Sequence, residues 1–214
     1  MAEVQRHGFD FENWVKTTFF TQNQFNYTEK WDIPAQFNIS NAVPGHLRGL
    51  PVSIKTCKNG GQVGFGDALR QYRNTEDFLL IVGFWTQAGA YKNFVAVEGV
   101  KVTVEAWRNL FLPLVEDDIQ KLDSLIKNRE LHYSEVRQRA QEIKKLESYA
   151  QTKIVLNPKI DSKIQRRLQC SLPFSIFWND FAKKSPYINI DCELFGYKVP
   201  NPFLSSARTF NPKS

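Results

Sequence analysis

The sequence predicts a mixed α/β fold in which a mixed central β-sheet is flanked by helices. Residues 52–57 alternate apolar and polar side chains, the period-2 pattern of a half-buried strand. Residues 78–85 form a continuous apolar run, which indicates a strand buried on both faces. In the first half of the chain, two strands are followed by a helix and then by two further strands. This order is typical of α/β sheets.

The N-terminal segment 8–20 is predicted to be an amphipathic helix, with Glu12 beside its apolar stripe. Residues 27–33 are predicted to form a strand that carries Asp32. Residues 38–50 contain Asn, Pro and Gly and predict a loop or hairpin before the next strand. The stripe residues recur at helical spacing: Phe11, Trp14, Val15 and Phe19.

The second strand, within 51–58, is the most informative stretch of the chain. Val52 and Ile54 point to one face, which can pack on a core. Ser53 and Lys55 lie side by side on the opposite face. A lysine on the polar face of a central strand favours a role in a cleft, whereas an ordinary solvated lysine is the alternative.

A glycine-rich turn follows this strand, and Gly66-Asp67 then indicates a helix start, with Asp67 as N-cap or first-turn residue. Gln71 lies four residues later and shares a helix face with Asp67. A solvated Gln71 is an equally simple interpretation. The further strand expected in this half of the chain is 94–97.

The second half of the chain is richer in helices. Segments 103–111, 115–129 and 133–151 have helical patterns, and acids open the second of them, as suits a helix N-terminus. Residues 153–156 predict a strand. The segment 157–169 then gathers Lys, Arg, Gln and Ser.

Length and composition predict a single domain over residues 1–214 with a sizeable core, since hydrophobic residues make up 42% of the chain. Residues 1–100 are expected to form a core that carries strands 27–33 and 51–58, and residues 101–214 a helical and basic elaboration. No apolar stretch approaches the ~20 residues of a membrane span. The start of the chain lacks a secretory signal pattern, and three widely spaced cysteines form no disulfide or zinc pattern, so a reducing cytoplasm is the expected location.

The net charge of +6 is distributed unevenly. Residues 1–150 hold equal numbers of basic and acidic side chains, whereas residues 151–214 hold 10 Lys and Arg against 4 Asp and Glu. A basic segment beside a metal-type site suggests a polyanionic partner such as double-stranded DNA. A lysine-rich solvated surface is the alternative.

The order of acid, strand lysine and second acid resembles the PD-(D/E)XK nuclease superfamily, which includes most type II restriction endonucleases. Over residues 1–100, Asp32 matches the family's first acid and Lys55 its lysine. The sequence departs from the family pattern where Trp31 replaces a proline and where Ile33-Pro34 follows the acid. It departs again at Ser53, which stands where the second acid is usual.

The resemblance implies a restriction-endonuclease-like fold and Mg²⁺-dependent hydrolysis of DNA. Some restriction enzymes resemble this chain in carrying Ser at the strand position and a carboxylate on the following helix, which would be Asp67. Asp32 and Asp67 would then bind the metal, and Lys55 would act beside them. Gln71 and Glu12 match residues that often border such sites, although Glu12 as a surface acid is an open alternative.

These residue types suit phosphodiester hydrolysis. Mg²⁺ prefers hard oxygen ligands, retains several waters and can both activate a water and stabilise charge on phosphoryl oxygens. An adjacent ammonium can orient the water and stabilise developing charge. Taken alone, Asp32 is more simply interpreted as a surface acid in a turn or at a strand end than as a metal ligand.

DNA contacts are expected mainly in 157–169, because Arg pairs with guanine and Gln with adenine, while Lys and Ser mostly contact phosphates. A basic, solvated helix end is the alternative. A homodimer is the default for a palindromic target. The residues expected to contact DNA are Ser53, Lys159, Lys163, Gln165, Arg166, Arg167 and Gln169.

The sequence therefore predicts a type II site-specific deoxyribonuclease. A repair or junction-resolving nuclease of the same superfamily and a non-catalytic nucleic-acid-binding protein on that scaffold are the alternatives. A small-molecule enzyme is disfavoured, because the chain has no dinucleotide fingerprint, phosphate-binding P-loop or Ser/His/Asp order.

Overall fold

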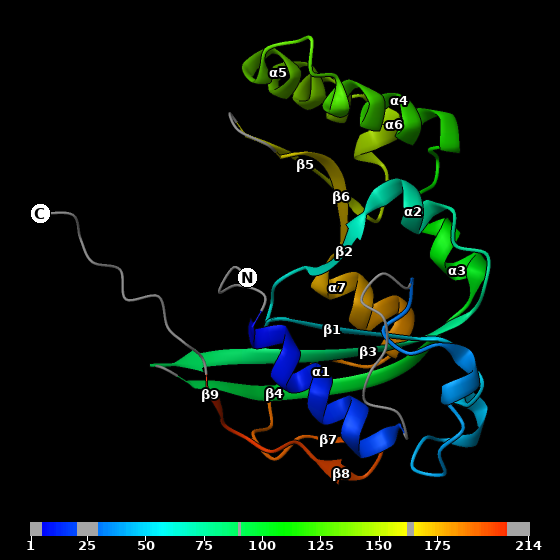
Figure 1. Ribbon diagram of the computed structural model, residues 1–214, viewed down its shortest axis with the longest axis vertical. Coiled ribbons are helices and arrows are strands. Elements are labelled where there is room, and N and C mark those ends of the chain that lie inside the picture. The colour runs from blue at the N-terminus through cyan, green and yellow to red at the C-terminus, as the bar shows by residue number, and fades with distance from the viewer. Residues whose placement is uncertain (1–5, 21–29, 90, 162–164, 205–214) are drawn as a thin grey trace, which may run out of the picture. The chain divides into compact units, whose positions relative to one another are not determined.

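The computed structural model describes residues 6–20, 30–89, 91–161 and 165–204 of the chain. It contains both strands and helices, as predicted for a mixed α/β protein (Figure 1). Among the described residues, no helix has both the length and the apolar composition to cross a membrane. The chain divides into two compact units, each built from separate segments: Met1–Gly61, Asp77–Lys101 and Trp178–Ser214 in the first, Gln62–Glu76 and Val102–Phe177 in the second.

The first unit is built around a four-stranded sheet of order β1-β3-β4-β9. Strands β1 and β3 are parallel, whereas β4 and β9 are antiparallel, so the sheet is mixed. Its elements are α1 (Arg6–Phe19), the 3-10 helices η2 (Ala35–Phe37) and η3 (Gly45–Leu47), β1 (Val52–Lys58), β3 (Phe78–Ala88), β4 (Tyr91–Val102), β7 (Glu193–Leu194), β8 (Tyr197–Lys198) and β9 (Phe203–Leu204).

Helix α1 packs against this sheet with the apolar stripe predicted from its sequence (Figure 1). The Phe11 ring stacks on Phe94 of β4, with 4.5 Å between ring centroids. Gly83 of β3 makes this approach possible, because a Cβ at that position would lie 2.5 Å from the Phe94 ring and 2.9 Å from Phe11. Val52 and Ile54 of β1 lie in the same core, as predicted.

The loop between residues 34 and 51 returns the chain to the start of β1. Asn38 is fully buried, and its side-chain amide donates to the carbonyls of Leu47 and Leu50 at 2.7 and 2.9 Å. The main chain of Gly49 donates back to the Asn38 carbonyl. These bonds satisfy buried peptide groups of a loop that has little regular structure of its own.

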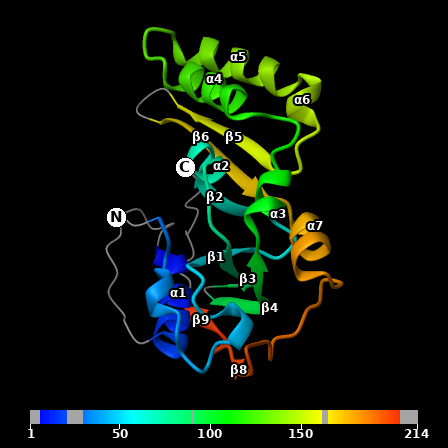
Figure 2. The ribbon, with the colours of Figure 1, turned by 90° about the vertical axis from the view of Figure 1, so that its right-hand side faces the viewer.

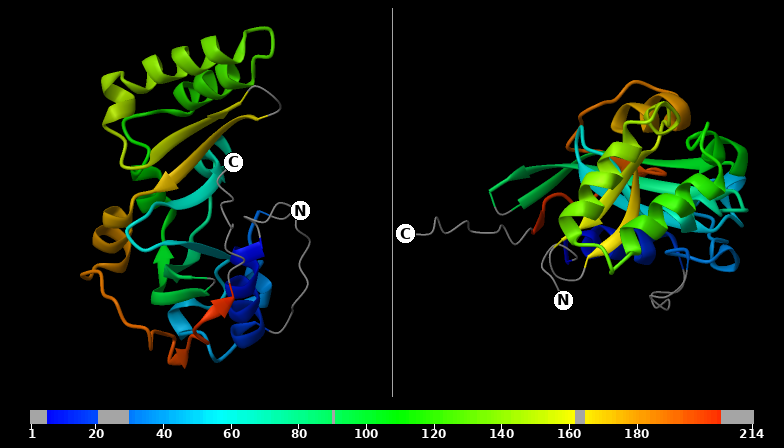
Figure 3. Two further views of the ribbon diagram at one scale, coloured as in Figure 1. Left: turned by 90° about the vertical axis from the view of Figure 1, so that its left-hand side faces the viewer. Right: turned by 90° about the horizontal axis from the view of Figure 1, so that it is seen from above.

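The second unit contains a three-stranded sheet of order β2-β6-β5, and both strand pairs are antiparallel. Helices α4 and α5 pack on β6 and β5, respectively (Figures 2 and 3). The elements are β2 (Val63–Asp67), α2 (Ala68–Tyr72), α3 (Val104–Asn109), α4 (Glu116–Lys127), α5 (Tyr133–Lys144), α6 (Glu147–Ala150), β5 (Val155–Ile160), β6 (Arg166–Leu172) and α7 (Phe174–Ile176); the π-helix η4 (Phe177–Ala182) leads back to the first unit in sequence.

Several element predictions need correction. The described part of the predicted strand 27–33 is a bend that ends in a single antiparallel bridge at Ile33. The predicted helix 133–151 is two helices, because the chain is extended at Leu146 (φ −60°, ψ 142°). The Tyr149 hydroxyl donates to the Asp118 carbonyl at 2.8 Å and thereby ties α6 to α4.

Two further segments are strands. The glycine-rich segment before α2 forms β2, which the sequence prediction missed. The described residues of the basic segment 157–169 belong to the hairpin β5–β6. This β structure puts alternate side chains on opposite faces, which decides the surroundings of each basic residue.

Candidate functional site

Asp32 and Lys55, which stand 23 residues apart, meet at the start of β1. The Oδ2 atom of Asp32 accepts hydrogen bonds from Lys55 Nζ at 2.9 Å and from the main-chain N–H of Ile54 at 2.6 Å. The Ser53 hydroxyl lies 3.4 Å from the same oxygen. The predicted first acid, the strand lysine and the serine at the strand-acid position thus form one cluster.

Neighbouring residues on both sides hold Asp32 in place. Ile33 is fully buried and forms an antiparallel bridge with Val52, with N–O distances of 3.2 and 2.8 Å. Trp31 packs against Phe78 of β3, with 5.0 Å between ring centroids. The bridge fixes the register of Asp32 against β1, so its carboxylate faces the main chain of Ile54.

The Asp32–Lys55 pair is accessible to a ligand. Each side chain keeps a quarter of its surface exposed. Within the described part of the chain, the hydrogen bonds to the Asp32 carboxylate all go to Oδ2, so Oδ1 has no protein donor. A carboxylate with one oxygen fixed and the other open can bind a cation or position a water.

Ser53 and Cys57 lie on the same face of β1 as Lys55, but their side chains are more buried than that of Lys55. Ser53 is 7% exposed, so it borders Asp32 from inside the fold and is poorly placed to contact DNA directly. Burial raises the pKa of the Cys57 thiol to about 12. Cys57 is therefore a neutral side chain at physiological pH and cannot act as a nucleophile there.

Glu12 forms an ion pair within its own helix. Its Oε1 atom accepts from Lys16 Nζ at 2.6 Å, an i,i+4 contact. This geometry matches the ordinary role of a helix-surface acid, and the predicted role of Glu12 beside the metal stays a prediction.

Asp67 and Gln71 belong to the second unit. Asp67 is the N-cap of α2, as its sequence context predicted, and its Oδ1 accepts from the Arg70 main-chain N–H at 2.8 Å. The Gln71 side-chain amide donates to the Phe65 carbonyl at 3.1 Å, and the Gln71 main-chain carbonyl accepts from the Trp107 indole N–H. Metal binding by Asp67 stays a prediction from the sequence.

The residues expected to contact DNA separate onto two faces of the hairpin. Lys159 and Arg167 are directly paired across β5 and β6, and both are exposed. Gln169 pairs with Asn157 on the same face. Gln165 lies at the hairpin end, where its main chain bonds to Asp161, and Lys163 lies outside the described residues.

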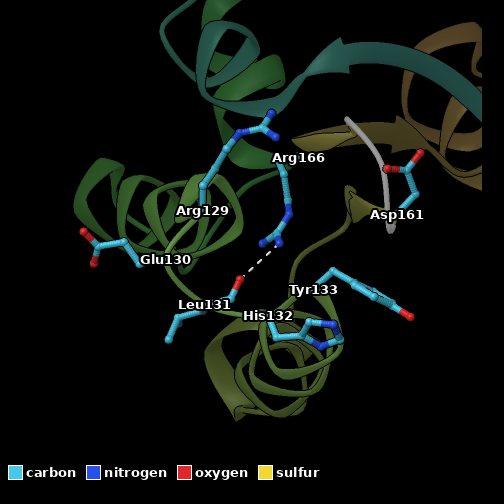
Figure 4. Close-up of a pocket in the computed structure, with 7 residues that line it drawn as sticks. All are labelled: Arg129, Glu130, Leu131, His132, Tyr133, Asp161 and Arg166. Carbon is cyan, nitrogen blue, oxygen red and sulfur yellow. Dashed lines mark hydrogen bonds between the residues drawn. The ribbon is translucent and has the colours of Figure 1, made fainter.

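Arg166 points to the opposite face and has a structural partner. Its guanidinium donates to the carbonyls of Asn128 and Leu131, at 3.0 and 3.2 Å, in the connection between α4 and α5. Figure 4 shows Arg166 directed at the Leu131 carbonyl, in a pocket of about 450 Å³ that His132, Tyr133 and Asp161 also line. Arg166 therefore joins the hairpin to the helical layer.

A hydrogen-bonded cluster on the polar face was not predicted. The Asn157 amide donates to the Ser171 hydroxyl at 2.8 Å, and that hydroxyl donates to Gln62 Oε1 at 2.6 Å. The alternation of polar and apolar residues from Arg167 to Leu172 is the period-2 signal of a strand and identifies Ser171 as a member of this face. Gln62 is brought in by the undetected strand β2.

Asp32 is the acid of this cluster that could bind the Mg²⁺ expected from the sequence. Within residues 6–20, 30–89, 91–161 and 165–204, no group of three or more His, Cys, Asp and Glu side chains gathers. Mg²⁺ does not need one, because it binds through one or two carboxylates, waters and substrate phosphates. The open oxygen of Asp32 is a suitable hard ligand.

Searches for similar proteins found no family model, curated protein or solved structure that matches the chain.

Proposed function

We propose that the protein is a Mg²⁺-dependent endonuclease that hydrolyses double-stranded DNA at a specific sequence, in the manner of a type II restriction enzyme. The observation that carries the proposal is the cluster of Asp32 and Lys55 at the start of β1. An oxygen ligand and an ammonium group, both partly exposed, lie 2.9 Å apart on adjacent main-chain segments. Metal-assisted phosphodiester hydrolysis can use the first as a metal ligand and the second to stabilise charge on the phosphoryl oxygens.

Each residue has a defined task in this proposal. Asp32 presents Oδ1 as a hard ligand while its Oδ2 is held by the Ile54 N–H. The Lys55 ammonium holds the attacking water and stabilises the negative charge that grows on the phosphoryl oxygens. When bound, Mg²⁺ lowers the pKa of a coordinated water and neutralises charge on the phosphate.

The proposal also needs a second carboxylate to bind Mg²⁺ beside Asp32. Ser53 cannot supply it, because a hydroxyl is a weak, neutral ligand for Mg²⁺ compared with a carboxylate. The sequence assigns that role to Asp67, whose Oδ1 caps α2. A carboxylate has two oxygens, so capping and metal binding are compatible.

Charge supports DNA as the substrate. Residues 153–172 contain five Lys and Arg and one acid, and most of this segment forms the hairpin β5–β6. Lys159 and Arg167 lie side by side on its exposed face. Paired cations on a ribbon suit the regularly spaced phosphates of a duplex.

A second candidate is a non-catalytic nucleic-acid-binding protein on the same scaffold. Two observations favour it: Ser53 replaces a strand acid, and the Lys55 ammonium is bonded directly to Asp32. In that case the ion pair would only join the Trp31–Ile33 segment to β1.

Digestion of a supercoiled plasmid separates these candidates. The full-length protein is incubated with a sequenced plasmid in Mg²⁺, with EDTA as the matched control, and the ends are mapped. Discrete Mg²⁺-dependent fragments with one shared end sequence are expected. DNA binding without cleavage in any divalent metal would favour the non-catalytic candidate, and cleavage confined to branched DNA would favour a repair or junction-resolving nuclease.

A further inference from the structure

The polar face of the β2-β6-β5 sheet carries a hollow that is lined by residues of all three strands. It has a volume of about 450 Å³ and is lined by Gln62, Gly64, Asn157, Lys159, Gln169 and Ser171, among others. The opposite face holds the buried side chains of Leu156, Leu168 and Leu172. One face of this sheet therefore contributes to the core, and the other offers polar groups to a ligand.

The hollow exists because β2 has glycines where side chains would otherwise stand. Gly64 pairs with Ser171 and is exposed. A Cβ added at Gly64 would meet no atom within 4 Å, and the residue has no positive φ. The pairing register of β2 shifts between Gly64 and Gly66, so these glycines flank a β-bulge, and the lack of a side chain at Gly64 also leaves the backbone open to another molecule.

The Gln62–Ser171–Asn157 cluster fixes the direction of two side-chain amides. Ser171 is 6% exposed, and its hydroxyl bridges Asn157 Nδ2 and Gln62 Oε1. This leaves Asn157 Oδ1 as an acceptor and Gln62 Nε2 as a donor, neither of which bonds to protein within the described part of the chain. The cluster therefore presents one acceptor and one donor together.

We infer that this hollow reads an adenine in the major groove of duplex DNA, an inference that rests on the proposed function. Adenine offers a donor at N6 and an acceptor at N7, which complement Asn157 Oδ1 and Gln62 Nε2; guanine offers two acceptors there. The neighbouring Lys159 and Arg167 supply the attraction to phosphates.

The width of the major groove favours DNA over RNA. The major groove of B-DNA displays the N6 and N7 edge of adenine to side chains, whereas the major groove of an RNA duplex is too narrow for side chains to read. Asp67 pairs with Gln169 at the edge of this face, and its carboxylate accepts from the Arg70 main-chain N–H. Asp161 lines the Arg166 pocket and not this hollow.

The test uses the full-length protein and two pools of duplexes, one of DNA and one of RNA, each with a randomised central segment. Bound duplexes are selected in EDTA and sequenced for wild type, Gln62→Ala, Asn157→Ala and Gly64→Val. Gln138→Ala is the matched control, because Gln138 is an exposed glutamine on α5. Circular dichroism melts verify that each variant is folded.

Wild type is expected to select a sequence with a fixed adenine. Gln62→Ala and Asn157→Ala should lose roughly 5- to 150-fold of the preference at that one position, the range for a bidentate base contact. Gly64→Val should weaken binding of the selected duplex, because its side chain enters the hollow. Gln138→Ala should behave as wild type.

Three outcomes overturn the inference. If wild type selects a sequence and both amide variants select it equally well, the hollow does not read a base, while the proposed function stands. If wild type prefers an RNA pool, double-stranded DNA is the wrong ligand. If wild type binds no nucleic acid and cuts no plasmid, the proposed function fails together with the inference.

Discussion

Asp32 Oδ2 and Lys55 Nζ lie 2.9 Å apart, and the same carboxylate oxygen accepts the Ile54 main-chain N–H at 2.6 Å. The contact is between a bend and a strand that are joined by a single β-bridge. It leaves the second oxygen of Asp32 without a protein donor among the described residues. The ion pair therefore fixes one oxygen of the Asp32 carboxylate and leaves the other able to bind a ligand.

Lys55→Ala should lower the rate of DNA cleavage by about 10²- to 10³-fold or more, because it removes the charge that stabilises the transition state. Folding should survive, since a partly exposed ion pair contributes only about 0–1 kcal/mol to stability. Lys58→Ala is the matched control, because Lys58 is an exposed lysine of the same strand. Single-turnover cleavage rates measure the effect, and a loss equal to that of Lys58→Ala would reduce Lys55 to a solvated lysine.

Asp67→Ala should be nearly inactive if Asp67 supplies the carboxylate that β1 lacks at Ser53. The double variant Asp67→Ala with Ser53→Asp should then recover part of the cleavage rate, because Ser53 borders Asp32. Recovery is limited because Mg²⁺ requires near-octahedral geometry at about 2.0–2.1 Å. Wild-type cleavage by Asp67→Ala alone would leave Asp67 as only the N-cap of α2, with a loss of stability of about 0.5–2 kcal/mol as its sole effect.

Arg166 and Arg167 should respond in opposite ways to replacement by alanine. Arg167→Ala should weaken DNA binding with little change in thermal stability, because its side chain is exposed beside Lys159. Arg166→Ala should lower the free energy of unfolding by about 1.5–3 kcal/mol, since it removes charged hydrogen bonds to the Asn128 and Leu131 carbonyls. Denaturant titrations and DNA-binding isotherms of both variants test this, and equal stability losses would contradict the two-face assignment.

The three cysteines should be unreactive in the folded protein. Burial raises the pKa of Cys57 to about 12 and of Cys192 to about 11, and it also raises the pKa of Cys170. At pH 8 the thiolate fraction is small, so alkylation by iodoacetamide should be slow, and it should become faster as the pH approaches 11. Rapid labelling of all three at pH 8 only after addition of denaturant is the expected result; rapid native labelling would contradict the buried positions.

The relation of Asp32 to Lys55 was predictable from sequence for a local reason. The period-2 pattern of residues 52–57 fixes which side chains of β1 face the core, and the short segment 34–51 leaves Asp32 near the start of that strand. The bend at residues 30–33 was not predictable as such, because one bridge has no periodic pattern. Residues 133–151 carry no Gly or Pro, so the sequence does not signal the break at Leu146.

The two arginines show where sequence reasoning ends. From the sequence alone, Arg166 and Arg167 are of the same residue type and both suit DNA. In β6 they point to opposite faces, because side chains alternate along a strand, so a single step in register separates a ligand-facing residue from a structural one. The pairing partners of β6 are distant in sequence, and only the tertiary structure supplies them.

The most direct test of the central claim is a double-variant cycle on single-turnover DNA cleavage in Mg²⁺, with wild type, Asp32→Asn, Lys55→Ala and the double variant. The Asn side chain preserves the shape of Asp32 but not its charge. If both residues form one catalytic centre, each single variant should lose most of the rate and the double variant should lose little more, while all four proteins bind the duplex. Cleavage by Asp32→Asn at the wild-type rate would contradict the claim and place the active site elsewhere.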